Sequence, residues 1–262
     1  MEQLLVKRDG GLLTVTLNAP DKGNALNEPL KVALRDTLVA AATDETVRAV
    51  VLTGNGKTFC VGQDLGEHAA ALEKGGPELA FATVGEHYNP IVTALATMPK
   101  PVIAAINGTC VGAGLGFALA CDIRIAAEEA KFGTAFIGIG LTGDSGLSAT
   151  LARAVGMARA SELMMLAEPF GAAQALEWGI VGKVVPAAEL AATTQKTAAR
   201  LAAGPTAAYA MIKRSLHGAW GADLESALAA EGTGQREVGS TADHTGAVTA
   251  FLSKQRPTFT GR

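Results

Sequence analysis

The chain has 262 residues, of which 48% are hydrophobic and 18% are charged, and its formal net charge is −3. This composition supports a large core and excludes an extensively disordered chain, and the slightly acidic balance argues against a general nucleic-acid-binding role. The three cysteines show neither metal-ligand spacing nor an even-numbered disulfide framework. No apolar run approaches the roughly 20 residues of a membrane helix, and no secretory signal precedes the first predicted strand. We therefore expect a reduced, cytoplasmic setting without metal or membrane contact.

Strands and helices alternate over the first part of the chain, and helices alone follow. Alternating or β-branched apolar runs predict strands at residues 12–17, 47–53, 102–106, 122–126 and 180–185. Apolar positions at helical spacing predict helices at residues 27–43, 84–98, 145–155, 158–167, 172–178, 187–203, 206–219, 223–238 and 241–254. Asn27 is the expected N-cap of the first helix, and Pro90 is a candidate kink in the second. Residues 66–83 have weak periodicity and are expected to be mobile or loosely helical. This order predicts an α/β fold with an α-helical tail.

The most informative stretch lies between Pro101 and Asp144. A strand at 102–106 leads into glycines at 108, 112, 114 and 116 and then into a helix of small residues that ends near Cys121. Glycines let the backbone approach a ligand closely, and the helix start leaves free N–H groups at the positive end of a dipole. Such a turn can stabilise a negative charge that develops on oxygen.

The same stretch carries a family resemblance. Lys100 to Asp122 reads KPVIAAINGTCVGAGLGFALACD, which resembles the pattern KPVIAAxNGxxxGGGxxLAxxCD of the crotonase, or enoyl-CoA hydratase/isomerase, superfamily. The resemblance implies a spiral of strand–strand–helix turns over residues 1–200, which binds a CoA thioester. It also implies a helical region over residues 201–262 that serves oligomerisation and covers the CoA, in a homotrimer or a dimer of trimers. Coenzyme A would enter as part of the substrate, without a further cofactor.

Two residues are expected to form an oxyanion hole. In the family, backbone N–H groups polarise the thioester carbonyl, one from the residue after the glycine of an FxxGxD loop and one from the glycine cluster. The matching positions here are Gln63, in FCVGQD, and Ala113. An enolate oxygen needs such donors, and a backbone donor does not depend on the side chain.

The two glutamates that activate water in the family's hydratases are missing. Gly116 stands at the first position, and Ala135 and Phe136 stand where the second occurs in a PE dipeptide. Neither replacement can hold or activate water. Hydration by the usual two-carboxylate mechanism is therefore not expected.

Asp144 is the carboxylate that remains. Family isomerases carry an aspartate at this place, and one carboxylate suits an isomerase because it removes a proton at one carbon and returns it at another. Apolar neighbours would raise its pKa and make it a stronger base. Alternatively, Asp144 only caps a helix that starts at Ser145, which would lower its pKa.

Further segments resemble the ring-epoxide isomerase of phenylacetyl-CoA degradation. These are GEHYNPIVTAL at Gly85 to Leu95 and the tail TADHTGAVTAFLSKQRPTFTGR. The segment GDSGL departs from that isomerase's PDCGG, so a ring-epoxide substrate does not follow. Chlorobenzoyl-CoA dehalogenase is a further relative that uses an aspartate at the place of Asp144 as a nucleophile. Its catalytic histidine has no counterpart here, since His87 is out of register.

The resemblance also supplies candidate contacts to CoA and the acyl group. Apart from Gln63 and Ala113, these are Lys22, Ala25, Leu26, Gly62, Asp64, Leu65, Tyr88, Gly112, Gly116, Phe136, Phe251 and Lys254. The last two match tail positions that in the family reach the nucleotide, often from a neighbouring subunit.

The expected function is an acyl-CoA isomerase that shifts a double bond or rearranges a ring epoxide, in phenylacetate catabolism or fatty acid metabolism. The alternatives are a hydratase-like enzyme, an aryl-CoA dehalogenase or hydrolase with Asp144 as nucleophile, and a non-catalytic acyl-CoA binder. The acyl group itself cannot be read from the sequence.

Overall fold

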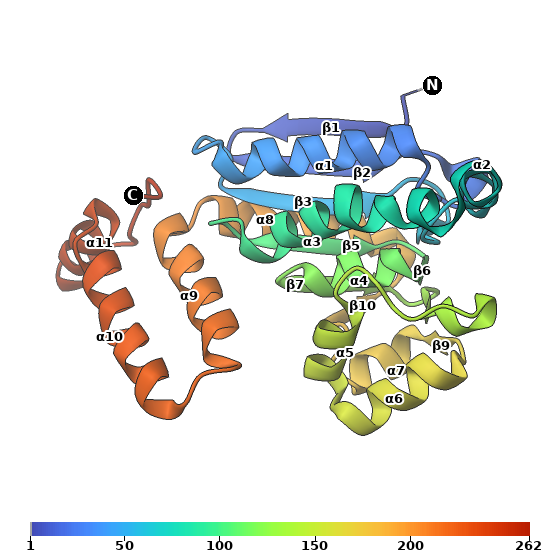
Figure 1. The fold of residues 1–262 in the computed structure, drawn as a ribbon. Coiled ribbons are helices and arrows are strands. Elements are labelled where there is room, and N and C mark those ends of the chain that lie inside the picture. The colour runs from blue at the N-terminus through green and yellow to red at the C-terminus, as the bar shows by residue number, and fades with distance from the viewer. Residues whose placement is uncertain (1) are drawn as a thin grey trace.

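The main layer of the molecule is a six-stranded sheet (Figure 1). The structure is a computed structural model, and it describes residues 2–262. The strand order is β1 (Leu4–Asp9), β2 (Leu12–Leu17), β3 (Ala49–Gly54), β5 (Val102–Ile106), β7 (Ile123–Ala127) and β10 (Lys183–Val185). β1 pairs antiparallel with β2, and every later neighbour is parallel. Parallel neighbours need crossover connections, which here contain the helices.

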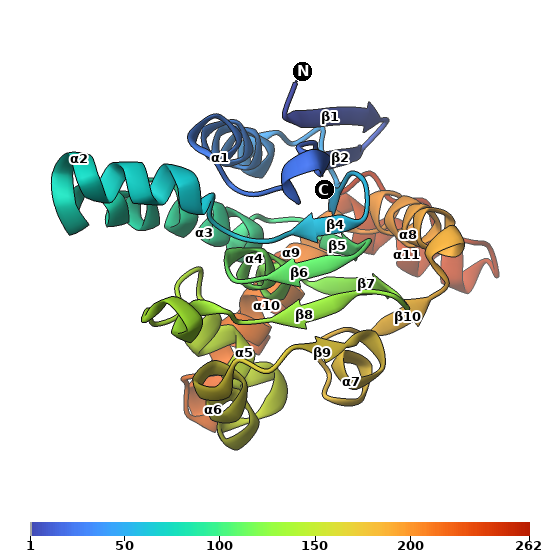
Figure 2. The same cartoon turned by 90° about the vertical axis from the view of Figure 1, so that its right-hand side faces the viewer.

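A second, smaller sheet lies beside the first (Figure 2). Its order is β4 (Thr58–Cys60), β6 (Thr109–Val111), β8 (Lys131–Gly133) and β9 (Phe170–Gly171). Strands β3, β5 and β7 of the main sheet are each followed by a short strand of the second sheet and then by a helix. This is the ββα spiral that the sequence resemblance implied.

Helices cover both faces of the main sheet. One face packs against α1 (Glu28–Thr43), α3 (Asn89–Thr97) and α4 (Ala113–Ala120), around a core that includes Leu34, Leu52 and Phe117. The other face packs against α8 (Ala187–Ala202), whose Leu190 and Leu201 share a smaller core with the strands. Each fully buried Leu or Phe contributes about 1.5–3 kcal/mol. Below the sheets in Figure 1 lie α5 (Leu147–Val155), α6 (Met157–Leu166) and α7 (Ala172–Glu177).

The last three helices extend away from this core in Figure 1 and lie behind it in Figure 2. They are α9 (Thr206–Ala219), α10 (Leu224–Gly239) and α11 (Ala242–Leu252). The buried Lys213 ties α9 to the core, because its Nζ donates to the carbonyl of Leu95 at 2.7 Å and to Asp122 Oδ2 at 2.9 Å. The expected C-terminal helical region is thus present.

Two local predictions were right about helical structure but missed its details. Residues 66–83 form the helix α2 (Leu65–Thr83), whose periodicity is interrupted because Gly75 and Gly76 leave helical φ/ψ. The helix expected at 84–98 begins as a π-helical turn, η2 (Val84–Tyr88), and Pro90 starts α3 without kinking it. Tyr88 and Asn89 both have helical φ/ψ, and the Asn89 N–H donates to the carbonyl of Val84, so η2 and α3 form one continuous helix.

Other elements were not predicted at all. The strands of the second sheet have two or three residues each, too few for a periodic signal. β1 has a single buried residue at its start, so its sequence shows no alternation. Among the described residues, no helix has the length and apolar character that crossing a membrane requires.

Candidate active site

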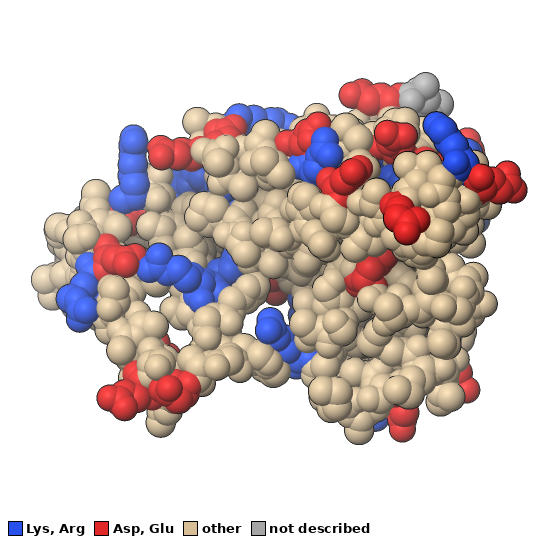
Figure 3. All heavy atoms as spheres, viewed as in Figure 1, with Lys and Arg blue, Asp and Glu red and all other residues tan. Residues whose placement is uncertain are grey.

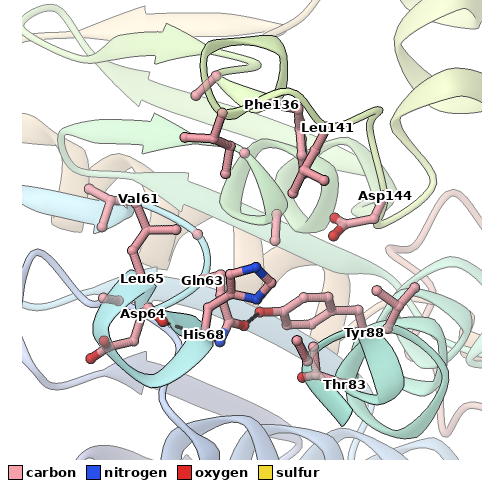
Figure 4. Close-up of a pocket in the computed structure, with 18 of the residues that line it drawn as sticks. Val61, Gln63, Asp64, Leu65, His68, Thr83, Tyr88, Phe136, Leu141 and Asp144 are labelled. Atoms are coloured by element: carbon pink, nitrogen blue, oxygen red, sulfur yellow. Dashed lines mark hydrogen bonds between the residues drawn. The ribbon is translucent and has the colours of Figure 1, made fainter. Parts of the chain in front are cut away.

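A cavity of about 610 Å³ lies between the loop after β4, the helices α2 and η2, and the loop at 134–144. Figure 4 shows that the labelled side chains surround one space. Most of the predicted site residues line it, namely Lys22, Ala25, Gly62, Gln63, Asp64, Leu65, Tyr88, Gly112, Ala113, Phe136 and Asp144. The fold therefore brings predicted residues from five separate segments of the chain to one cavity.

Gln63 and Ala113 meet at the floor of this cavity. Gly62, at φ +87°, turns the chain after β4 so closely onto the start of α4 that a Cβ there would lie 3.3 Å from Ala113 N. Ala113 is the first residue of α4, after Gly112 at φ 58°. Within residues 2–262, neither the Gln63 N–H nor the Ala113 N–H donates a hydrogen bond. Two free donors beside a buried helix start suit a developing oxyanion.

A short backbone ladder fixes this loop. Leu26 N–H donates to the carbonyl of Gly62 at 2.8 Å, and Asp64 N–H donates to the carbonyl of Leu26 at 3.3 Å. Leu26 is fully buried and does not line the cavity, so it holds the loop in place. Ala25, its neighbour, does reach the cavity wall.

The mouth of the cavity carries charge. Asp64 caps α2 by accepting from the N–H groups of Gly66 at 3.0 Å and Glu67 at 3.1 Å. Lys22 Nζ lies 3.8 Å from Asp64 Oδ2, with its side chain largely exposed. A mobile lysine at a cavity entrance can meet a phosphate without a costly desolvation.

Asp144 lies across the cavity from Tyr88 (Figure 4). Burial raises the pKa of its carboxyl, and a hydrogen bond from Ser145 Oγ at 2.8 Å partly opposes this rise. Helix α5 begins at Leu147 with Gly146 as its N-cap, and the Asp144 side chain accepts no helix N–H. The predicted helix is therefore present but begins two residues later than Ser145, and the alternative that Asp144 only caps this helix was wrong.

Tyr88 is almost fully buried, and its hydroxyl donates to Gln63 Oε1. Burial and the nearby Asp144 raise the pKa of Tyr88 far above its ordinary range, so the hydroxyl stays protonated. Tyr88 thus links helix η2 to Gln63, whose N–H is one of the two candidate oxyanion donors.

Besides Leu26, three more of the predicted binding residues do not line the cavity. Gly116 lies behind it in α4, and a Cβ there would come within 2.5 Å of Ser145 Cβ and 2.6 Å of the Ser145 carbonyl oxygen. Phe251 is 81% exposed on α11, and Lys254 follows that helix; neither reaches the cavity of its own chain. By contrast Phe136, at the second glutamate position, does form part of the wall.

His68 was missed by the sequence analysis. It lies in the first turns of α2, its ring stands edge-on to Phe81 at 5.2 Å between centroids, and it lines the cavity. Had Asp64 been recognised as a helix N-cap, the spacing of three residues would have placed Leu65 and His68 on the same helix face. The interrupted periodicity of residues 66–83 concealed the helix. His87 lies outside the cavity lining, with Nδ1 3.1 Å from Thr83 Oγ1.

Gly116→Ala tests the packing behind the cavity. We expect a loss of about 1–3 kcal/mol in the free energy of unfolding, because the new Cβ overlaps the backbone of Ser145. Urea denaturation measures the loss. Gly218→Ala in α9 is the control, since a Cβ there meets nothing within 4 Å and should stabilise the helix slightly. Equal stability of wild type and Gly116→Ala would contradict the close packing.

The ββα turns and the cavity define a crotonase-type fold, and comparison with known proteins agrees. The family model described as enoyl-CoA hydratase/isomerase matches residues 7–262. A crystal structure of an enoyl-CoA hydratase/isomerase family member from Mycobacterium abscessus superposes with a TM-score of 0.95 at 46% identity, over 99% of this chain and 100% of the other. The chain belongs to the enoyl-CoA hydratase/isomerase family, so the recognition made from its sequence is confirmed.

The relatives carry names for different reactions. The chain is 41% identical to 1,2-epoxyphenylacetyl-CoA isomerase of Escherichia coli K12, over 100% of both chains. It is 36% identical to 2,3-dehydroadipyl-CoA hydratase of the same strain, again over 100% of both. A 4-chlorobenzoyl coenzyme A dehalogenase of an Arthrobacter species is 34% identical over 84% of this chain and 80% of its own. Family membership supports an enzyme but leaves its reaction open.

Proposed function

We propose that this protein is an acyl-CoA isomerase that works through an enolate, with Asp144 as the acid and base. The observation that carries the proposal is the set of side chains around the cavity. Asp144 faces the cavity with a raised pKa, while Gly116 and Phe136 occupy the positions of the water-activating glutamates. One carboxylate can move a proton, but water addition needs a second group to hold and activate the water.

The proposed reaction uses two backbone donors and one carboxylate. The thioester carbonyl accepts hydrogen bonds from the N–H groups of Gln63 and Ala113. Asp144 removes a proton from a carbon near that carbonyl, and the electron pair moves onto the oxygen as an enolate. Asp144 then returns the proton to a different carbon, which shifts the double bond. The negative charge leaves the carboxylate and arrives beside two backbone donors, which is the arrangement that lowers such a barrier.

The acyl group is proposed to be unsaturated or ring-containing. Apolar residues line the acyl side, among them Phe81, Val84, Ile139 and Leu141. They would accept a hydrocarbon or an aromatic ring and exclude water from the enolate. The relative named 1,2-epoxyphenylacetyl-CoA isomerase makes a phenylacetyl-derived ring the first substrate class to try.

A panel of thioesters tests the proposal. The protein is incubated in deuterated water with a straight-chain 3-enoyl-CoA, a 2-enoyl-CoA and phenylacetyl-CoA, and the products are followed by NMR and mass spectrometry. We expect deuterium near the thioester and double-bond migration, without a hydrated product. A 3-hydroxyacyl-CoA product would favour the hydratase alternative. Binding without exchange on any thioester would favour the non-catalytic binder.

Nucleophilic attack by Asp144 is the second candidate, because a relative is named 4-chlorobenzoyl coenzyme A dehalogenase. In that case the Asp144 carboxylate would add to the ring carbon that bears chlorine and chloride would leave, which gives an aryl ester on Asp144. Water would then attack the ester carbonyl of Asp144 and release the hydroxylated ring. A single turnover of 4-chlorobenzoyl-CoA in ¹⁸O water distinguishes the two candidates. Label in the Asp144 carboxylate would favour the nucleophile.

The C-terminal helices are proposed to bind neighbouring copies of the chain, in a homotrimer or a dimer of trimers. They expose large apolar side chains that the core does not cover, including Ile212, Leu216, Trp220, Leu224, Leu228, Phe251 and Leu252. A hollow of about 570 Å³ lies between the end of α3, α9 and α10. In Figure 3 open gaps separate parts of the C-terminal helices from each other and from the rest of the molecule. Large apolar side chains exposed together on neighbouring helices favour an interaction site.

Phe251 and Lys254 are then expected to contact CoA bound to a neighbouring subunit. Replacing Lys254 with Ala should raise the KM for a CoA thioester several-fold, because an ammonium paired with phosphate is lost. The KM for the matching pantetheine thioester, which lacks the nucleotide, should not change. Steady-state kinetics on both thioesters measures the effect. Equal effects on the two would place Lys254 outside the nucleotide site.

A further inference from the structure

A buried lysine and a partly exposed glutamate form an ion pair beside the loop that carries Gln63. Lys31, in the first turn of α1, is only 2% exposed, and its Nζ lies 2.6 Å from Glu67 Oε1. Glu67 stands in the first turn of α2, directly after the loop that carries Gln63. Moving a lysine out of water lowers stability, and pairing its charge often does no more than offset this loss. A hydrocarbon side chain at position 31 could therefore make the protein as stable or more stable. The charge therefore calls for an explanation.

Glu67 fixes the lysine from one side. Its Oε2 accepts a hydrogen bond from Glu28 N–H at 2.6 Å, at the start of α1. The same glutamate donates its own N–H to Asp64, the N-cap of α2. Glu67 thus joins the first turns of α1 and α2 and leaves the Lys31 ammonium little freedom.

The free side of the ammonium points to Gln63. Lys31 Nζ lies 3.4 Å from Gln63 Oε1, and the Tyr88 hydroxyl donates to the same oxygen. Gln63 Nε2 donates to the carbonyl of Asp64 at 3.3 Å. Both polar atoms of the Gln63 side chain are therefore held. The backbone N–H of the same residue, at the cavity wall, has no hydrogen-bond acceptor among residues 2–262.

We propose that Lys31 is a positioning residue for the oxyanion hole. Held by Glu67, it fixes the Gln63 side chain from behind, so that the Gln63 N–H keeps its aim at the thioester carbonyl. Its positive charge also lies on the side of the loop away from the substrate, where it favours negative charge on the carbonyl oxygen. The inference rests on the role proposed above for Gln63.

The thioester carbonyl itself reports on this role. Phenylacetyl-CoA with ¹³C at the carbonyl is bound to the protein, and infrared difference spectra give the carbonyl stretching frequency. A polarised carbonyl absorbs at a lower frequency than the free thioester. We expect this lowering in the wild type and the loss of most of it in Lys31→Met. The kcat on an isomerised thioester should fall about tenfold or more, with a smaller change in KM, because a small misplacement of a catalytic group costs rate.

Three further variants separate positioning from folding. Glu67→Gln keeps an acceptor for the Glu28 N–H but weakens the hold on Lys31, and should lose part of the frequency shift. In a Gln63→Met background, which keeps the backbone N–H, Lys31→Met should have little additional effect if it acts through the Gln63 side chain. Lys100→Met is the control. Lys100 is 3% exposed and donates to the carbonyls of Ala41 at 2.6 Å and Asp44 at 2.9 Å, at the far end of the same helix.

Several results would overturn the proposal. One is a carbonyl frequency shift that stays at the wild-type value in both Lys31→Met and Glu67→Gln. Another is a loss of the shift in Lys100→Met that equals the loss in Lys31→Met. A third is a loss caused by Lys31→Met that is as large in the Gln63→Met background as in the wild type. A bound wild-type thioester with no shift would also overturn it. A shift in the wild type without turnover of any thioester would instead reject the isomerase function alone, because the frequency is measured without a reaction.

Discussion

Asp144→Asn should remove nearly all proton exchange while the thioester still binds. We expect a loss of about 10²- to 10⁴-fold in kcat, because an amide cannot accept the proton that the reaction must move. The asparagine has almost the same shape and keeps an oxygen for the Ser145 hydroxyl, so KM should change little. The rate of deuterium incorporation and the kcat for double-bond migration measure the effect. Exchange at the wild-type rate would move the base elsewhere.

The same residue should set the pH dependence of the rate. The activity should fall as the solution is made more acidic, because the base becomes protonated. Since burial raises the pKa of Asp144, this fall should occur at a higher pH than for an ordinary aspartate. Ser145→Ala is the matched variant. It removes the hydrogen bond that lowers this pKa, so the fall in activity should occur at a higher pH still.

The stability of the protein should respond in the opposite sense to the activity. A carboxyl with a raised pKa in the folded state binds its proton more tightly than in the unfolded state, so folding becomes less favourable as pH rises through the carboxyl range. Asp144→Asn lacks this titration. It should therefore be more stable than the wild type near neutral pH, and the difference should vanish below the ordinary aspartate range. Thermal denaturation from about pH 3 to pH 8 covers both pKa values.

Ala113→Pro should abolish one of the two oxyanion donors. A proline has no N–H, and the loss of one such donor typically costs about 10²- to 10³-fold in rate. Position 113 is the first residue of α4, where proline is tolerated because its fixed φ suits a helix start. The variant should therefore fold, lose rate and also lose part of the lowered carbonyl frequency.

Ala113→Gly is the control for this substitution, since it keeps the N–H and removes only a methyl group. Its kcat should stay close to that of the wild type. Circular dichroism and thermal denaturation show whether both variants keep the fold. A folded Ala113→Pro protein with wild-type activity would exclude the Ala113 N–H from the reaction.

The sequence predicted the fold well where the elements are long. The strands at 12–17 and 102–106 and the C-terminal helices were placed within a few residues, because burial on one or both faces leaves a clear pattern. The second sheet was missed because its strands are short and are stabilised by neighbours rather than by their own composition. The ββα spiral itself came from the family motif.

The site was predicted less evenly. Gln63, Ala113 and Asp144 belong to motifs, and the structure places all three around one cavity. Lys31, Glu67 and His68 belong to no motif, and only the packing of α1 against the loop before α2 brings them to the site. Gly116 was taken for a lining residue, but its neighbour in space, Ser145, lies 29 positions along the chain and no local pattern shows it.

The contact between Gly116 and Ser145 also constrains how this protein could evolve. A glutamate at position 116 would have to enter a place that the backbone of Ser145 already fills. The turn at 144–146, which presents the carboxylate of Asp144, would have to move first or at the same time. A single substitution of Gly116 by glutamate therefore cannot supply a carboxylate there without moving the turn. Each intermediate sequence that opens the turn would displace the base on which the present chemistry is proposed to depend. The two activities are thus separated by a barrier of packing, although only a few side chains distinguish them.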